Sequence, residues 1–191
     1  MKPASNSGLS RLKRHLLGIP EPVTRPDQFV FGSEAHSMWL ENGKRETYLT
    51  AAEEEQLTAM VASLQKSAAQ RYIEHPKVQL EVVLEKKLAG VPCLGKLDIF
   101  NKQEKVIADL KTTSTNNPDL FLASAVAYDY FRQAYFYQRL TGVEKFLFIA
   151  VSKVAPYRVH LLDVSKYPRQ MYAAKQEFDF LLHFYGKHYA V

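Results

Sequence analysis

Two aspartates and a lysine stand in neighbouring apolar segments, with a spacing suited to metal-ion chemistry. The stretch GKLDIFNKQEKVIADLKTT holds Asp98 and Asp109, each in the middle of an apolar run, and Lys111 two positions after Asp109. Because side chains alternate between the two faces of a strand, Asp109 and Lys111 share one face. The same alternation places Lys96, Asp98 and Phe100 on a common face of the preceding strand.

A hairpin between these two strands would bring the carboxylates together. If the chain turns at Gln103 and Glu104, Asp98 lies directly across from Asp109. Opposed like charges destabilise a sheet, and the burial of an unpaired carboxylate is costly. Mg²⁺, with Mn²⁺ as a substitute, would compensate this charge because it prefers hard oxygen ligands. Lys111 beside such an ion would hold a water molecule or stabilise negative charge on a phosphate.

Two other interpretations of this hairpin fit the same residues. A one-residue slip in register would move the two aspartates to opposite faces of the sheet. A solvated hairpin, in which Lys96 pairs with Asp98 and Asp109 with Lys111, would show the same pattern. The hairpin alone therefore predicts a metal site only if its register brings the aspartates together.

Composition places the chain among ordinary globular proteins. The 191 residues, of which 47% are hydrophobic, are enough to bury one core, so we expect one domain. We expect a cytoplasmic protein, because the chain contains neither a run long enough to span a membrane nor the apolar region of a secretory signal. Cys93 is expected in the core. A net charge of +5 permits an anionic partner without requiring one.

The order of the remaining elements is that of a mixed α/β protein. We expect N-terminal helices at about 5–18, at 33–43 and at 51–72. Ser5 or Ser7 would be the N-cap of the first of these helices. Strands are predicted at 78–85, 94–100 and 105–111, followed by a helix that begins at Asp119 or Tyr128 and ends at Leu140. Strands at 144–153 and 157–164 and a final helix at 167–185 complete the order βββαββα.

Several short motifs, taken in order, resemble a known superfamily. They are Ser5-x-Ser7-x-Leu9, Gly32-x-x-x-His36, Gly95-x-Leu97-Asp98, the run from Asp109 to Thr113, and Gln133-x-x-x-Tyr137. Together they are similar to the PD-(D/E)xK nucleases, in particular to the RecB/RecE-like, lambda-exonuclease-like branch. The resemblance implies a central mixed sheet flanked by helices, with a restriction-endonuclease-like αβββαβ core. Within 1–191 it implies N-terminal helices at 1–75, a catalytic core at about 76–165 and a C-terminal helix at 166–191.

The resemblance also implies a role for individual residues. Asp98, Asp109, His36 and the backbone carbonyl of Leu110 would bind the metal, and Lys111 would be the catalytic lysine. An acid on the preceding strand would assist, and both Glu81 and Glu85 are candidates for that position. The residues implied or proposed to contact DNA are Gln133, Tyr137, Thr112, Thr113 and Arg132. For each the alternative is structural: His36 would pack near Trp39, and Gln133 and Tyr137 would belong to an amphipathic helix.

The function implied is a Mg²⁺-dependent exonuclease that hydrolyses linear DNA in phage-type recombination or repair. Its expected partners are duplex or single-strand DNA ends, with a single-strand annealing protein and a second copy of the chain as further candidates. The alternatives are a catalytically silent protein that binds DNA or a partner, a structure-specific endonuclease, and a structural module with solvated aspartates. The chain has no GxxxxGK[ST] phosphate loop, so we expect any ATP-driven motor to be a separate protein.

Overall fold

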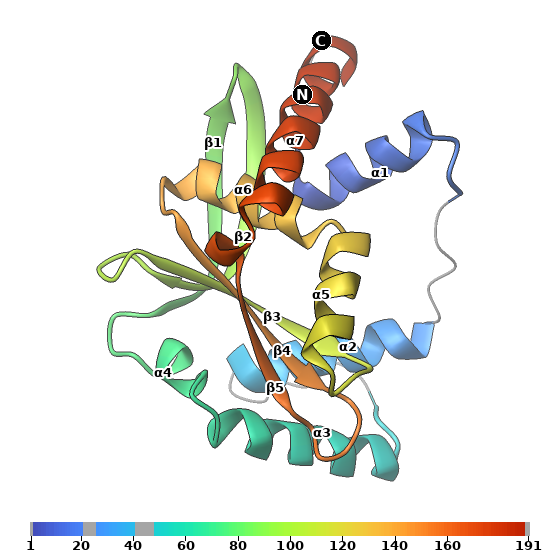
Figure 1. The fold of residues 1–191 in the computed structure, drawn as a ribbon, viewed down its shortest axis with the longest axis vertical. Helices are drawn as coiled ribbons and strands as arrows, with labels where there is room; N and C mark the ends of the chain where they lie inside the picture. The colour runs from blue at the N-terminus through green and yellow to red at the C-terminus, as the bar shows by residue number, and fades with distance from the viewer. Residues whose placement is uncertain (1, 21–25, 41–47, 190–191) are drawn as a thin grey trace.

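Five strands form a mixed sheet in the order β1-β2-β3-β4-β5 (Figure 1). The computed structural model describes residues 2–20, 26–40 and 48–189. The strands are β1 (Gln79–Leu88), β2 (Val91–Asn101), β3 (Val106–Thr113), β4 (Lys145–Ser152) and β5 (Val159–Asp163). Strands β3 and β4 run parallel, and the other neighbours are antiparallel. The parallel pair needs a long connection, and two helices between β3 and β4 provide it.

Helices cover both faces of the sheet and enclose two hydrophobic cores. The first core lies under α1 (Asn6–Leu16), α5 (Pro118–Ala127), α6 (Tyr130–Thr141) and α7 (Pro168–Tyr189). The second lies under α2 (Pro26–Leu40), α3 (Ala51–Gln65) and α4 (Gln70–Ile73). A short 3-10 helix, η1 (Val164–Lys166), joins β5 to α7. The predicted α/β fold class is confirmed, and the observed order differs from the predicted βββαββα in having two helices, α5 and α6, between β3 and β4.

Local signals explain where several elements begin and how they are anchored. The Ser5 hydroxyl accepts a hydrogen bond of 3.2 Å from the backbone N–H of Gly8 and so caps α1, as expected. Thr50 and Glu53 form a reciprocal capping box at the start of α3. Cys93 is buried in the first core, and burial raises the pKa of its thiol to about 11. In the described part of the chain, no helix combines the length and the apolarity that crossing a membrane requires.

Three helical predictions differ from the structure. The predicted helix at 51–72 is two helices, α3 and α4. The predicted helix ending at Leu140 is also two, because Asp129 adopts a left-handed conformation with φ 58° and interrupts it between α5 and α6. Helix α2 begins at Pro26 rather than Ser33, and the predicted cap at Gly43 lies outside the described residues.

The alternation of side chains between the two faces of the sheet is interrupted at Glu81 in β1 and at Asp98 in β2. Along a regular strand, Leu97 and Ile99 would share one face. Instead Leu97 packs in the first core and Ile99 in the second. Glu81, opposite Asp98 in the register, has a positive φ of 56°, and the paired residues resume on either side of it. The outer part of the β1–β2 hairpin is therefore turned relative to the rest of the sheet, and it rises beside α7 in Figure 1.

This change of face corrects one prediction. Regular alternation would place Lys96, Asp98 and Phe100 on a common face. Phe100 is buried in the same core as Leu97, so the alternation breaks at Asp98. The sequence gives no sign of this break, because neither Glu81 nor Asp98 is a glycine.

Candidate metal centre

The site lies where β2 and β3 separate. These strands pair from Asn101↔Val106 to Ile99↔Ala108, which is the predicted register, and the pairing stops there. Beyond that point the backbone N–H of Leu110 donates a hydrogen bond of 2.8 Å to Oδ2 of Asp98. The Asp98 carboxylate therefore takes the place of a backbone acceptor in the ladder.

Helix α2 brings a histidine to the same opening. The Nε2 atom of His36 lies 2.7 Å from the carbonyl oxygen of Leu110, so this ring nitrogen donates a hydrogen bond to it. The Nδ1 atom of His36 lies 3.6 Å from Oδ2 of Asp98. Burial lowers the pKa of His36, which favours the neutral imidazole. A neutral ring with Nε2 protonated leaves the Nδ1 lone pair directed to the side of Asp98.

Strand β3 and helix α6 contribute a second carboxylate with its partners. Gln133 Nε2 donates a hydrogen bond of 2.6 Å to Oδ2 of Asp109. Oδ1 of Asp109 forms an ion pair with the ammonium group of Lys111, yet it is buried and accepts no hydrogen bond of good geometry from the described residues. A buried carboxylate oxygen of this kind is an available ligand.

Strand β1 supplies the third acid. One ligand atom from each of His36, Glu81 and Asp98 lies within 4.8 Å of the others. Glu81 also forms an ion pair with Lys96. Glu85 is exposed and lies opposite Leu94, further along the hairpin. Of the two candidate acids, Glu81 is therefore the one that lies at the site.

The charged groups at the site shift one another's pKa values. Burial, reinforced by the negative charge of Asp109, raises the pKa of Asp98 to about 8. Burial alone would lower the pKa of Lys111, but Asp109 and Asp98 outweigh burial and raise it. The lysine is thus held in its charged form, and the two carboxylates carry more negative charge than the site accommodates without a further cation.

The donor set fits a small divalent cation. Ligand atoms from His36, Glu81 and Asp98 lie together at one opening of the sheet, where His36 also contacts the Leu110 carbonyl, and Asp109 precedes Leu110 on the same strand. Mg²⁺ and Mn²⁺ accept this mixture of oxygen and imidazole ligands. The buried Oδ1 of Asp109, which is paired with Lys111 alone among the described residues, and the raised pKa of Asp98 are both features that such a cation would relieve.

Three residues predicted to contact DNA lie near the site in different settings. Tyr137 is buried between aromatic neighbours, with its ring stacked on Phe146 at 6.1 Å, so little of its surface is available to a ligand. Burial raises the pKa of Tyr137, and its hydroxyl shares a hydrogen bond with the Gln133 side chain. Thr113 is buried at the end of β3, and Thr112 is half-buried.

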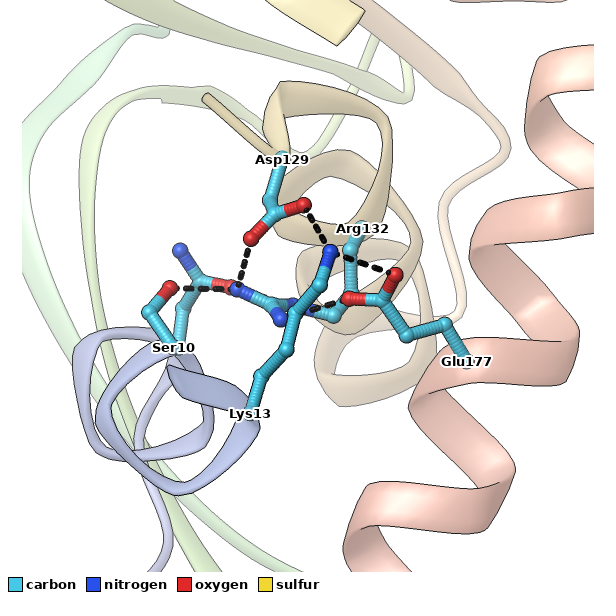
Figure 2. Close-up of polar contacts among 6 residues, drawn as sticks. Ser10, Lys13, Asp129, Arg132 and Glu177 are labelled. Atoms are coloured by element: carbon cyan, nitrogen blue, oxygen red, sulfur yellow. Dashed lines mark hydrogen bonds and ion pairs between the residues drawn. The ribbon is translucent and has the colours of Figure 1, made fainter. Parts of the chain in front are cut away.

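The prediction that Arg132 contacts DNA is wrong. Its side chain is only 1% exposed and forms an ion pair with Glu177 of α7 at 2.7 Å. Figure 2 shows the guanidinium enclosed by this carboxylate, by Asp129 and by Ser10 of α1. Arg132 therefore joins three helices inside the protein and is not available to a phosphate.

One residue at the site was not predicted from the sequence. The Lys111 Nζ atom lies 5.1 Å from the centre of the Tyr130 ring, which stacks on Phe148. Tyr130 precedes Gln133 by three positions, so the two residues are neighbours on one helix surface. That spacing is a signal by which Tyr130 could have been found.

The comparisons with known proteins agree with this geometry. A family model described as a PDDEXK-like domain of unknown function (DUF3799) matches residues 12–183. No curated protein sequence matches the chain significantly. A candidate exonuclease from Eubacterium rectale has a similar structure, with a TM-score of 0.62, 18% identity, and coverage of 88% of this chain and 71% of that one. The structure of a phage-related exonuclease from Haemophilus somnus 129PT has a TM-score of 0.43 and 14% identity, with coverage of 92% of this chain and 94% of that one. The first likeness shows the restriction-endonuclease-like fold.

Proposed function

The chain belongs to the family of PDDEXK-like domains, and on that premise we propose that it is a metal-dependent deoxyribonuclease. The observation that carries this proposal is the constellation at the opening between β2 and β3. It combines Asp98 and Asp109 with a half-buried lysine, Lys111, and with a histidine that reaches the Leu110 carbonyl. Burial of a carboxylate is costly unless a cation compensates it, and Lys111 is the cation paired with Asp109.

Each residue of the site would have a separate role in metal binding or in stabilising the phosphate. Asp98, Asp109, His36 and the Leu110 carbonyl would hold Mg²⁺, with Glu81 beside them. The bound ion would supply Lewis-acid stabilisation of a phosphate and a water of lowered pKa. Lys111 keeps its proton and would stabilise negative charge as it develops on the phosphate. Gln133 holds Asp109 in place through its amide.

We further propose that the enzyme acts on DNA ends. The similar structure from Eubacterium rectale is that of a candidate exonuclease, which supports this mode by analogy of fold. Digestion of linear DNA during phage-type recombination or repair is the activity expected of such an enzyme. The two threonines that follow Lys111 remain candidates for phosphate contacts, with Thr112 the more accessible of the two.

The test is a nuclease assay on end-labelled linear duplex and on closed circular DNA, with Mg²⁺, with Mn²⁺ and with EDTA. We expect degradation of the linear substrate, its loss in EDTA, and an intact circle. Asp109→Asn and Lys111→Met should each abolish activity. The Lys175–Asp179 pair on α7 is a matched control, because it has the same charges at 2.6 Å but is exposed. Lys175→Met and Asp179→Asn should retain full activity.

Other outcomes would point to the alternatives. Cleavage of the closed circle would identify an endonuclease. DNA binding without cleavage in either metal would identify a catalytically silent protein. Full activity in both the Asp109 and the Lys111 variants would refute the proposed site, whatever the substrate.

A further inference from the structure

The junction between α5 and α6 places two tyrosines next to the site. Tyr128 is the C-cap of α5, Tyr130 begins α6, and Asp129 stands between them in a left-handed conformation. Such a conformation is uncommon for a residue other than glycine, although aspartate tolerates it better than most. The turn is therefore specified by its surroundings rather than by local preference.

Ion pairs hold this turn from the side of the first core. Asp129 is bound by Lys13 at 2.6 Å and by Arg132 at 3.3 Å (Figure 2). Both cations also bind Glu177 of α7, at 2.8 Å for Lys13 and 2.7 Å for Arg132. Ser10 of α1 accepts a further hydrogen bond from Arg132. Two cations and two anions thus compensate each other, and they fix the backbone at Asp129 against α1 and α7.

The tyrosines continue an aromatic column that starts in the core. Phe148 of β4 is buried, and the Tyr130 ring stacks on it with centres 5.1 Å apart and planes at 26°. The Tyr128 ring follows at 6.1 Å and is 69% exposed. Lys111 lies beside this column, with its Nζ atom 5.1 Å from the Tyr130 ring centre. One end of the column is therefore anchored, and the other end presents an aromatic ring to solvent.

We propose that Tyr128, supported by Tyr130, is a stacking platform for an unpaired nucleobase of the DNA strand whose phosphate occupies the candidate metal centre. This inference rests on the proposed function. A strand presents phosphates and flat bases in fixed succession. The protein presents the Lys111 ammonium group beside Tyr130 and, one ring further out, the exposed ring of Tyr128. A base inside a duplex has both faces covered by its neighbours, so the platform selects strand ends with unpaired nucleotides.

The platform is testable by binding alone. Labelled DNA hairpins would carry a single-stranded tail, 5′ or 3′, with either normal or abasic nucleotides, and binding would be measured by fluorescence anisotropy with Ca²⁺, a cation that takes oxygen ligands and would occupy the site. We expect the tail with bases to bind about 5- to 100-fold more tightly than the abasic tail, as stacking of one base predicts. Tyr128→Ala should lose this preference, and Tyr128→Trp should keep it.

Tyr172 provides the matched control. Its ring is 66% exposed, like that of Tyr128, but it lies on α7, which contributes no residue to the candidate site. Tyr172→Ala should bind both tails as the unsubstituted protein does. An equal preference for bases in Tyr128→Ala and in the unsubstituted protein would overturn the platform, as would the absence of any preference in the latter.

The stacking platform and the proposed nuclease activity can be refuted independently of each other. A protein that cleaves DNA while Tyr128→Ala retains the preference for bases would be a nuclease without this platform. A protein that prefers tails with bases through Tyr128, but cleaves no DNA with Mg²⁺ or Mn²⁺, would have the platform without the proposed activity.

Discussion

Gln133 on helix α6 donates a hydrogen bond of 2.6 Å to Oδ2 of Asp109 on strand β3. This contact fixes the orientation of the carboxylate and leaves Oδ1 directed to Lys111. Because groups that orient a ligand affect metal affinity, Gln133→Ala should weaken Mn²⁺ binding by about 10- to 100-fold. Isothermal titration calorimetry measures this directly.

The neighbouring glutamine on the same helix is a control for that substitution. Gln138 donates to the carbonyl oxygen of Glu144 at the other end of α6, away from the carboxylates. Gln138→Ala should leave Mn²⁺ affinity unchanged. Equal losses in both variants would mean that damage to α6, and not the contact with Asp109, explains the effect.

Asp98 should make the metal-free protein less stable as the pH rises. Burial and Asp109 raise its pKa in the folded state from 3.8 to about 8. Between these two values the folded protein holds a proton that the unfolded chain has released. The contribution of this group to folding therefore becomes steadily less favourable from about pH 4 to pH 8 and then levels off.

Asp98→Asn removes this titration while keeping an oxygen that can accept from Leu110. In EDTA at pH 8 the variant should be more stable than the unsubstituted protein by at least about 2 kcal/mol, with the difference shrinking towards pH 4. Urea unfolding at several pH values gives the difference curve. A difference that does not vary with pH would show that the Asp98 pKa is close to its ordinary value.

Arg132 should matter for stability rather than for binding DNA. Its side chain is 1% exposed, and its removal would leave the mutually close Asp129 and Glu177 with Lys13 alone. Arg132→Met should lower the free energy of unfolding by about 2–4 kcal/mol, because breaking a buried pair leaves uncompensated charge.

Lys175→Met breaks an exposed pair on α7 and is the reference for this change. It should cost less than about 1 kcal/mol. Urea unfolding measures both variants. A similar small loss for Arg132→Met would mean that the guanidinium is not confined as Figure 2 shows it.

Gly95 permits the close approach of α6 to β2. A Cβ atom at this position would lie 2.6 Å from Cδ1 of Leu140 and 2.8 Å from Cε1 of Tyr137. Gly95→Ala should therefore push α6 outward, cost about 1–3 kcal/mol and weaken Mn²⁺ binding by displacing Gln133. Thermal unfolding and calorimetry test the two effects.

Substitution of Gly32 on α2 by alanine should have the opposite effect on stability. A Cβ atom there meets no described atom within 4 Å, and alanine is favoured over glycine inside a helix. Gly32→Ala should stabilise the protein by about 0.5–1 kcal/mol. A loss of stability equal to that of Gly95→Ala would remove the steric explanation.

The hairpin shows what the sequence determines locally. The short turn between β2 and β3 fixes the register, so the positions of Asp98 and Asp109 relative to each other follow from the sequence. The change of face at Glu81 does not, because a positive φ at a glutamate reflects the surrounding structure rather than its residue type.

Arg132 shows what the sequence cannot determine. In the run YFRQ it stands next to Gln133, and nothing local separates a residue at the site from one buried behind it. Its burial depends on α1 and α7, which supply Ser10 and Glu177 from distant parts of the chain. Contacts of this range have no signature in a local pattern.

The placement of the site between the two cores has a consequence for folding. His36 comes from α2 over the second core, and Gln133 comes from α6 over the first. A partly folded chain with only one core in place would therefore lack either the ligand His36 or Gln133, which orients the ligand Asp109, and its set of site residues would be incomplete. An ion that binds only the complete set stabilises both halves together by mass action. Metal binding would thus make unfolding more nearly all-or-none, and the loss of metal would be an early sign that either half has opened.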